Sequence, residues 1–332
     1  MGEFELIQRY FTRPTANAQV ALGIGDDCAL LQPTPGMQLA ISSDMLIEGR
    51  HFLSTVKPAH LGHKALAVNL SDLAACGARP LGFTLALAMP FVDEPWLEGF
   101  SRGLFDLADA HGCTLIGGDT TRGPLAICVT VFGEVPKGQA LLRSGAKPGD
   151  DLYVSGTVGD ARLTLEAFRG TVSLPQTVFE QVRIRMEQPT PRVALGQALR
   201  GIASAAIDVS DGLLGDLQHI LTASRVGAVI DTSIAIDLLA ARAGLTGIGS
   251  TFSLNTALTC VLSGGDDYEL AFTAPKILRD AVHAAAVQSQ TPVTRIGEIQ
   301  LGTGYRLLDA QGALVADTFR SFDHFADSSC HC

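Results

Sequence analysis

Residues 64–89 read KALAVNLSDLAACGARPLGFTLALAM and join one apolar helix directly to one apolar strand. Apolar residues recur at three- and four-residue spacing over His60–Cys76, which predicts a helix. The following Gly-Ala-Arg-Pro predicts its end, and Phe83–Met89 has the length and composition of a buried strand. A helix beside a buried strand indicates an α/β core. Asp72 falls on the apolar stripe of this helix, where a carboxylate without a partner would be costly.

Helices and strands alternate along the rest of the first half. We predict strands over Leu39–Asp44, Thr114–Ile116 and Leu125–Glu134 and a helix from Asp93, as its N-cap, to about His111. The first of these strands delivers Asp44 at its carboxyl end, and Thr114–Ile116 runs into a turn at Gly117-Gly118-Asp119. Ligand sites of α/β proteins favour the carboxyl ends of strands.

The second half repeats this alternation. We predict strands over Asp151–Ser155, Ala205–Asp208, Ala228–Asp231, Glu269–Thr273, Arg295–Ile299 and Tyr305–Leu308, with helices over about 160–200 and 275–288. A further helix runs from Leu213 to about Ser224, with Ser210 as its predicted N-cap. Its start is also a predicted anion-binding end.

The length of 332 residues favours two domains, because single cores seldom grow that large. Glycine and proline gather between Lys137 and Asp150, which is typical of a domain junction. We therefore predict an N-terminal domain over 1–137, a junction over 138–150 and a C-terminal domain over 151–332, both domains of mixed α/β structure.

The composition excludes several classes of protein. The formal net charge is −10, from 34 acidic and 24 basic residues, which argues against a nucleic-acid-binding or anionic-membrane surface. No apolar run reaches the ~18 residues of a membrane span, and residues 1–20 lack the apolar core of a signal peptide. The seven cysteines form no CxxC pair, so reduced thiols and a cytoplasmic location are expected. The tail Cys330-His331-Cys332 is interpreted as a frayed terminus.

Aspartates gather in glycine-rich segments of the chain. The set comprises Asp26, Asp27, Asp44, Asp72, Asp119, Asp208, Asp211, Asp266 and Asp267. A single Gly-Asp pair is more often a turn than a ligand, but turns alone do not explain so many acids near predicted strand ends. Clustered carboxylates repel one another unless a cation neutralises them. Oxygen donors without paired His or Cys favour Mg²⁺ or Mn²⁺, which commonly share their coordination shell with phosphates.

Common nucleotide and nucleophile signatures are absent from the chain. It contains no GxxxxGK[ST] loop, no GxGxxG fingerprint and no protein-kinase motif set. Arg143, in a Leu-Leu-Arg-Ser-Gly loop, is a candidate phosphate contact and could equally be a surface arginine. No Ser-His or Cys-His pair suggests a protein nucleophile, so no catalytic residue is assigned.

Seven motifs, taken in order, resemble the thiamine-monophosphate kinase family across almost the whole chain. They are GIGDDCALL (23–31), SSDMLIEGRHF (42–52), KALAVNLSDLAACGARP (64–80), LIGGDTTRG (115–123), RSGAKPGD (143–150), IDVSDGLLGDL (207–217) and SGGDDYEL (263–270). The resemblance implies the two-domain fold of the aminoimidazole-ribonucleotide synthetase superfamily. It also implies an N-terminal domain that forms a homodimer and a C-terminal domain that closes the cleft.

The resemblance further implies the reaction and the residues of the site. ATP would phosphorylate thiamine monophosphate to thiamine diphosphate by direct in-line transfer, with several Mg²⁺ ions. The implied metal ligands are Asp27, Ser42, Ser43, Asp44, Asp72, Asp119, Asp208 and Asp211. ATP would contact Gly118, Asp119, Arg143 and Ser210, and thiamine monophosphate would contact His51, Asp266 and Phe322.

Some alternatives stay open at this stage. Asp266 stands where the family usually has glutamate, which makes that substrate contact less certain, and Phe325 competes with Phe322 for the aromatic contact. His51 could also be an ordinary polar residue without a role in binding, and Phe322 could be a core residue. Another ATP-using enzyme of the superfamily, such as an aminoimidazole-ribonucleotide synthetase-like or hydrogenase-maturation-like enzyme, would share the acids. An acidic metal-binding protein without activity would explain the aspartates but not the order of the motifs.

Overall fold

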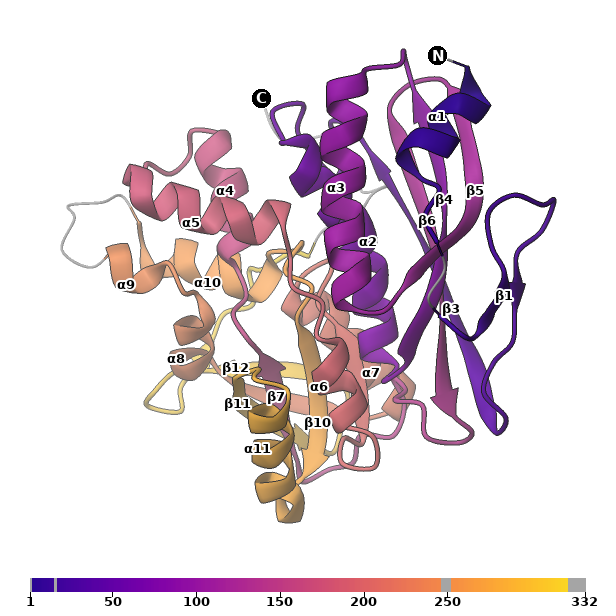
Figure 1. Ribbon diagram of the computed structural model, residues 1–332. Helices are drawn as coiled ribbons and strands as arrows, with labels where there is room; N and C mark the ends of the chain where they lie inside the picture. Colours follow the sequence, from indigo (N-terminus) through magenta and orange to yellow (C-terminus); the bar gives the residue numbers. More distant parts are fainter. Residues whose placement is uncertain (1, 15–16, 246–251, 322–332) are drawn as a thin grey trace. The chain divides into compact units, whose positions relative to one another are not determined.

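The computed structural model describes residues 2–14, 17–245 and 252–321 (Figure 1). The chain divides into two compact units. Unit 1 comprises Met1–Leu141 and Glu187–Gly201, and unit 2 comprises Leu142–Met186 and Ile202–Cys332. Residues 187–201 thus belong to the first unit, although they follow the predicted junction at 138–150. Each unit is therefore made of two separate stretches of the chain. In the described part of the chain, no helix is long and apolar enough to cross a membrane.

Unit 1 is built on a four-stranded sheet in the order β3-β6-β4-β5. Its elements are α1 (Glu3–Tyr10), β1 (Val20–Leu22), β2 (Leu30–Leu31), β3 (Met37–Ile47), α2 (Pro58–Ala75), β4 (Arg79–Met89), α3 (Glu94–Ala110), β5 (Thr114–Arg122), β6 (Ala126–Pro136) and α6 (Val193–Ala198). Strands β4 and β5 are parallel, whereas β6 pairs antiparallel with β3 and β4. The predicted helix 60–76 and the predicted strand 83–89 are confirmed as α2 and β4.

In the unit 1 sheet, many side chains of β4 and β6 are buried, whereas a row of apolar side chains on β3 is exposed. Helix α2 packs against α3, β3 and β6, and the two helices lie side by side over one face (Figure 1). Alternate side chains of β4 and β6, such as Phe83 and Val131, are fully buried. On β3 the apolar side chains Leu39, Ile41, Met45 and Ile47 are exposed, with Ile41 at 59%. This single chain therefore leaves an apolar strip uncovered along β3.

Unit 2 is built on a seven-stranded sheet in the order β13-β12-β9-β11-β7-β10-β8. Its strands are β7 (Asp150–Ser155), β8 (Ala205–Asp208), β9 (Gly227–Asp231), β10 (Leu270–Pro275), β11 (Val293–Gln300), β12 (Gly304–Leu308) and β13 (Leu314–Val315). Its helices are α4 (Asp160–Phe168), α5 (Gln176–Glu187), α7 (Leu213–Ser224), α8 (Thr232–Ala235), α9 (Arg242–Leu245), α10 (Leu254–Ser263) and α11 (Arg279–Gln288), with short 3₁₀ turns at Ile236–Leu238 and Lys276–Leu278. Every residue of β7 is buried, including the polar residues Asp150, Asp151 and Ser155.

Three local predictions were wrong. Strand β3 continues past Asp44 to Ile47, so Asp44 lies within a strand and not at its end. Gly117-Gly118-Asp119 is also strand, because β5 runs on to Arg122 in parallel register with β4. The N-cap of α7 is Gly212 and not Ser210. The predicted cap at Asp93 is confirmed, since its carboxylate accepts the N–H of Trp96 at 3.1 Å.

Candidate active site

Ser42 and Asp72 come together in unit 1. The Oγ of Ser42 on β3 donates a short hydrogen bond to Oδ2 of Asp72 on α2. Asp72 is therefore partnered on its apolar stripe, as its position required. A hydroxyl and a carboxylate in contact are two hard oxygen donors, the chemistry that Mg²⁺ prefers.

Asp44 is held by a residue that the sequence interpretation did not single out. Its backbone N–H donates to Oδ1 of Asn69 at 3.0 Å, although β3 also pairs with β6 through the register Asp44–Val129. Asn69 is 1% exposed, and its Nδ2 donates to the carbonyl of Ala65 one turn earlier in α2. Ser43 points to the other face of the strand, where its hydroxyl lies 2.8 Å from Oγ1 of Thr130.

Gly118 and Asp119 lie on β5, the edge strand opposite β3. Gly118 has φ +148°, and a Cβ there would lie 1.9 Å from the carbonyl oxygen of Leu85, so no other residue fits. The register rows run from Asp44 through Val129 and Leu85 to Gly118. Three strand spacings of about 4.8 Å place Asp44 and Asp119 roughly 14 Å apart. One chain does not bring these two predicted ligands to the same ion.

Asp27 and His51 lie in loops of unit 1. Asp27 is exposed, and its N–H donates to Oδ1 of Asp26 at 2.8 Å. The Nδ1 of His51 accepts the N–H of Ile47 at 3.0 Å, which directs the proton of a neutral imidazole to Nε2. The buried ammonium of Lys64 donates to the carbonyl of His51 at 3.2 Å. The His51 loop is thus fixed from α2.

In unit 2, Asp208 and Asp211 flank a tight turn between β8 and α7. Asp208 is buried at the end of β8, and Asp211 is exposed. Oδ2 of Asp216 accepts the N–H groups of Ser210 and Asp211 at 3.0 Å and of Gly212 at 3.1 Å. The predicted anion-binding end at Ser210 is therefore wrong for these three donors, because a side chain already occupies them. Burial raises the pKa of the Asp216 carboxyl to about 7, and the Asp211 charge adds to this rise.

The loop that carries Asp266 is strained and interlocked with this turn. Asp266 has φ +73° and Tyr268 has φ +52°, conformations that non-glycine residues rarely adopt. The N–H of Asp266 donates to the carbonyl of Ser210, and that of Tyr268 to the carbonyl of Val209, both at 2.8 Å. Backbone strain of this kind is retained where surrounding contacts enforce it, often at functional sites.

The buried carboxylate of Asp267 ties the same loop to the start of α4. Both carboxylate oxygens of Asp267 lie 2.9 Å from the N–H of Gly159, and burial raises the pKa of Asp267 well above its ordinary value. Glu269, also buried, accepts from Arg185 at 2.8 Å and from Ser155 at 2.6 Å. These bonds fix the backbone on either side of Tyr268.

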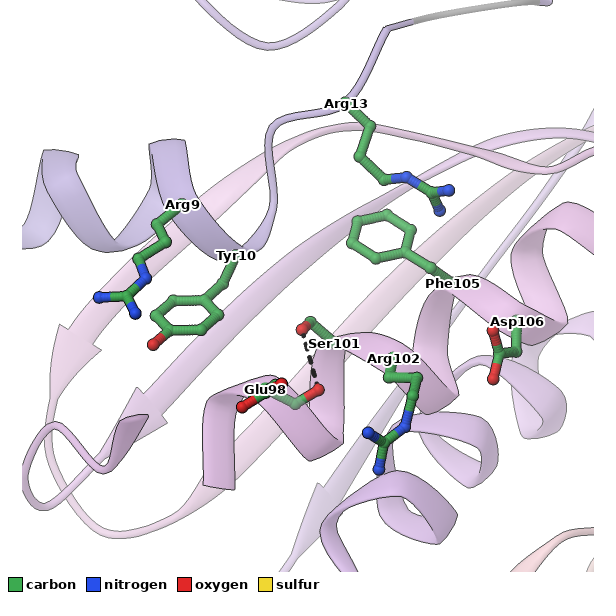
Figure 2. Close-up of a pocket in the computed structure, with 8 residues that line it drawn as sticks. All are labelled: Arg9, Tyr10, Arg13, Glu98, Ser101, Arg102, Phe105 and Asp106. Atoms are coloured by element: carbon green, nitrogen blue, oxygen red, sulfur yellow. Dashed lines mark hydrogen bonds between the residues drawn. The ribbon is translucent and has the colours of Figure 1, made fainter. Parts of the chain in front are cut away.

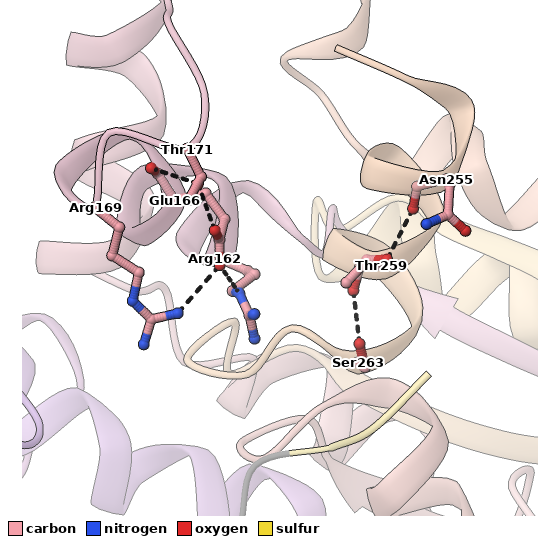
Figure 3. A network of polar contacts seen from close by, with 7 residues as sticks. All are labelled: Arg162, Glu166, Arg169, Thr171, Asn255, Thr259 and Ser263. Atoms are coloured by element: carbon pink, nitrogen blue, oxygen red, sulfur yellow. Dashed lines mark hydrogen bonds and ion pairs between the residues drawn. The ribbon is translucent and has the colours of Figure 1, made fainter. Parts of the chain in front are cut away.

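Helices α4 and α10 border this loop in unit 2. Arg162 pairs with Glu166 at 2.6 Å, and Arg169 and Thr171 contact the same carboxylate (Figure 3). At the end of α10, Ser263 donates to the carbonyl of Thr259 at 2.9 Å. A Cβ on the next residue, Gly264, would lie 2.6 Å from Cβ of Arg162, so the glycine permits this close packing.

Two further predicted contacts complete the set. Arg143 is exposed, and its carbonyl accepts the hydroxyl of Ser224 at 3.2 Å, so its loop is tied to the end of α7. Phe322 and its competitor Phe325 lie outside the described residues.

The metal prediction can be compared with the donors in each unit. Among the described residues, no three or more His, Cys, Asp or Glu side chains are grouped so as to hold a metal ion. The donors present are serine hydroxyls and aspartate carboxylates, which fit Mg²⁺, an ion that usually completes its shell with water and substrate phosphates.

The cavity of about 510 Å³ in unit 1 lies away from all these residues. Figure 2 shows it between α1 and α3, lined by Arg9, Tyr10, Arg13, Glu98, Ser101, Arg102, Phe105 and Asp106. Arg9 pairs with Glu94 at 2.9 Å and Arg13 with Asp109 at 3.0 Å. These guanidinium groups are already matched by carboxylates, so the cavity adds nothing to the candidate site.

Comparison with known proteins identifies the family. The model described as AIR synthase related protein, N-terminal domain, matches residues 25–135, and its C-terminal domain counterpart matches residues 147–309. The thiamine-monophosphate kinase of Salmonella typhimurium is 47% identical over 327 residues, which cover 98% of each chain. The chain belongs to the thiamine-monophosphate kinase family.

Solved structures of the thiamine-monophosphate kinase family share this fold. The crystal structure of the enzyme from Stenotrophomonas maltophilia K279a is 46% identical, with a TM-score of 0.83, over 95% of this chain and 98% of that chain. AaThiL complexed with AMPPCP and TMP is 28% identical, with a TM-score of 0.74, over 88% and 89% of the two chains. The predicted fold class, a two-domain α/β fold of this superfamily, is confirmed.

The sequence interpretation passed over the residues that hold the predicted ligands. Asn69 and Asp216 lie inside the quoted motifs but were assigned no role, and Asp267 was counted among the clustered aspartates without a supporting role. One signal was available for Asn69 and Asp216: each is a polar residue in an apolar segment, where burial demands a hydrogen-bond partner.

Proposed function

We infer that this chain phosphorylates thiamine monophosphate with ATP to give thiamine diphosphate. The observation that carries this inference is the 47% identity to a thiamine-monophosphate kinase along 98% of both chains. AaThiL, which binds AMPPCP and TMP in its solved complex, supplies the matching pair of ligands. The alternatives, another enzyme of the superfamily or an inert metal-binding protein, leave this near-complete relationship unexplained.

We propose the site residues as follows, each within its own unit. In unit 1 the metal ligands are Asp27, Ser42, Ser43, Asp44, Asp72 and Asp119, with Gly118 against ATP and His51 against thiamine monophosphate. In unit 2 the metal ligands are Asp208 and Asp211, with Arg143 and Ser210 against ATP and Asp266 against thiamine monophosphate. Phe322 stays a prediction for the substrate contact.

The chemistry of the acceptor explains why a protein base is unnecessary. A phosphate monoester has a second pKa of about 6, so near neutral pH it is largely dianionic and already nucleophilic. The reaction then forms a bond from an acceptor oxygen to the γ-phosphorus and breaks the bond to the β,γ-bridging oxygen, and ADP leaves. Bound Mg²⁺ supplies charge neutralisation and alignment of these oxygens. The side chains of this chain supply the oxygen atoms that would bind Mg²⁺, and they keep the loops of the site in place.

We propose that the chain forms a homodimer through the uncovered face of the unit 1 sheet. The exposed strip on β3 is an apolar surface that a second copy would cover. The two edge strands, β3 and β5, each carry a predicted ligand, and one chain keeps these ligands apart. Sedimentation should show a dimer that Ile41→Glu dissociates, whereas Ile277→Glu, at a residue 90% exposed in unit 2, should leave it intact. A monomeric native protein would contradict the proposal.

A coupled assay for ADP release tests the reaction. Thiamine monophosphate should be the accepted substrate, and thiamine and aminoimidazole ribonucleotide precursors should give no turnover above background. Asp266→Asn should raise the KM for thiamine monophosphate about threefold to tenfold and leave that for ATP unchanged, because one charge beside the thiazolium is lost. Turnover with an aminoimidazole precursor instead would redirect the assignment. We also propose a cytoplasmic location, because Cys28, Cys113, Cys128 and Cys260 are free thiols in the described part of the chain.

A further inference from the structure

Asp216 is buried in α7, and its carboxylate reaches back over the turn that precedes the helix. Its exposure is 4%, and one oxygen, Oδ2, accepts three consecutive backbone N–H groups at 3.0–3.1 Å. These groups belong to Ser210, Asp211 and Gly212, and the first two are proposed contacts of ATP and metal. A single side-chain oxygen thus holds three consecutive residues of the turn.

The turn is also fixed on its other side. Its carbonyls at Val209 and Ser210 accept N–H groups from the loop that carries Asp266. Gly212 has φ +120°, and a Cβ there would lie 2.9 Å from the carbonyl carbon of Ser263. With contacts on both sides, the turn has little freedom to rearrange when a ligand arrives.

The occupied amides change what the turn can bind. Free N–H groups at a helix start are the usual site for a bare phosphate. Here three of these donors are used within the protein, so the turn presents the exposed Asp211 carboxylate and the half-buried Ser210 hydroxyl. A carboxylate binds phosphate only through a cation.

We propose that Asp216 is a positioning residue that makes this turn selective for metal-bound nucleotide over free nucleotide. The proposal rests on the proposed function, which places Asp211 on metal and Ser210 on ATP. Asp216 touches neither ligand and acts by closing the amide site and by aiming Asp211. A simple helix cap would stabilise α7 without affecting this selectivity.

The test compares Asp216→Ala and Asp216→Asn with Asp231→Ala in the full chain. Asp231 is a matched control, because its Oδ1 accepts the N–H groups of Ser233 at 2.9 Å and Ile234 at 3.3 Å at the start of α8. Calorimetry would measure the affinity of a non-hydrolysable ATP analogue, once with Mg²⁺ and once with EDTA. Melting temperatures would be recorded alongside.

Asp216→Ala should weaken the Mg²⁺-bound analogue about tenfold or more, the equivalent of about one charged hydrogen bond. The affinity for the metal-free analogue should be unchanged or higher, because the three backbone N–H groups are released. The affinity of Asp216→Asn for the Mg²⁺-bound analogue should stay within about threefold of that of the native protein, because the amide oxygen can accept the same N–H groups. Asp231→Ala should lower the melting temperature and leave both affinities unchanged.

Equal loss of affinity in Asp216→Ala and Asp231→Ala, or no loss in Asp216→Ala, would reduce Asp216 to a helix cap. If Asp216→Ala does not fold, Asp216→Glu replaces it, because the extra methylene displaces the accepting oxygen while keeping the charge. Unchanged selectivity in that variant would overturn the proposal. If the native protein binds the Mg²⁺-bound analogue but does not phosphorylate thiamine monophosphate, the proposed function fails while the role of Asp216 is still decided.

Discussion

The two units hold their predicted ligands in different ways. In unit 1, Ser42 and Asp44 lie on a long strand, and Asp72 lies on the helix that packs over it. In unit 2, Asp211 and Asp266 lie in turns whose backbones are held by buried carboxylates, Asp216 and Asp267. Strand register in unit 1 is redundant, because many backbone hydrogen bonds specify it. The turns of unit 2 have fewer backbone hydrogen bonds and each relies also on one buried side chain, so we expect them to be more sensitive to substitution of that residue.

The largest effect is expected where a ligand itself is changed. Asp72→Asn in unit 1 and Asp211→Asn in unit 2 should each lower kcat about a hundredfold or more, since each removes a charge that would hold Mg²⁺. Steady-state kinetics at saturating Mg²⁺ measure this. Asp280→Asn, at an exposed position on α11, is the control. Full activity in Asp211→Asn together with a loss in Asp72→Asn would confine the metal site to unit 1.

Arg143→Ala should have the next largest effect. The loss of a charge-assisted contact to phosphate should raise the KM for ATP about tenfold and change that for thiamine monophosphate much less. Arg102→Ala, an exposed arginine of unit 1, should leave both constants unchanged. Equal KM values for ATP in Arg143→Ala and native protein would show that Arg143 makes no contact with ATP.

Asn69→Ala tests the claim that unit 1 is redundant. The variant removes the acceptor for the N–H of Asp44, yet β3 keeps its register with β6. We expect the affinity for Mg²⁺-bound ATP analogue to fall by no more than about threefold, less than for Asp216→Ala. Calorimetry on both variants gives the comparison directly. A larger loss in Asn69→Ala would show that side-chain support matters more in unit 1.

The smallest difference concerns stability and pH. Asp151 in unit 2 and Glu134 in unit 1 are buried acids. Burial alone would raise the pKa of each carboxyl. Hydrogen bonds and charge outweigh burial and lower both values, mainly from Arg279 for Asp151 and from Thr34 and Arg79 for Glu134. A lowered folded-state pKa contributes stability above the ordinary value of about 4, and this stability is lost as the pH falls through the folded-state value.

Arg279→Gln should therefore lower the free energy of unfolding at pH 7, because Asp151 loses two bonds of 2.6 and 2.8 Å and keeps the longer contacts to Tyr153 at 3.2 Å and Arg295 at 3.4 Å. Arg79→Gln should cost less, because Thr34 still donates to Glu134 from its N–H at 2.9 Å and its hydroxyl at 3.0 Å. Urea unfolding at pH 7 and at pH 3 measures both. The differences from native protein should shrink at pH 3, where the carboxyls of the unfolded chain are protonated. A pH-independent difference would mean that the arginines act through packing.

The sequence by itself determined the family, the fold class and most of the regular elements. Local periodicity sufficed for α2 and β4, because a buried helix and a buried strand each impose their own spacing on apolar residues. The strand ends at Asp44 and Asp119 were wrong, because pairing with neighbouring strands extends a segment beyond its local turn signals.

Only the tertiary structure decided how the predicted ligands are held. Ser42 meets Asp72 across 30 positions of sequence, and no local pattern encodes that contact. The sequence could not show that Asp216 occupies the amides before α7, because the same residues would also suit a free anion site. Which hydrogen-bond donors remain available depends on where a buried side chain turns, and packing in three dimensions alone settles that.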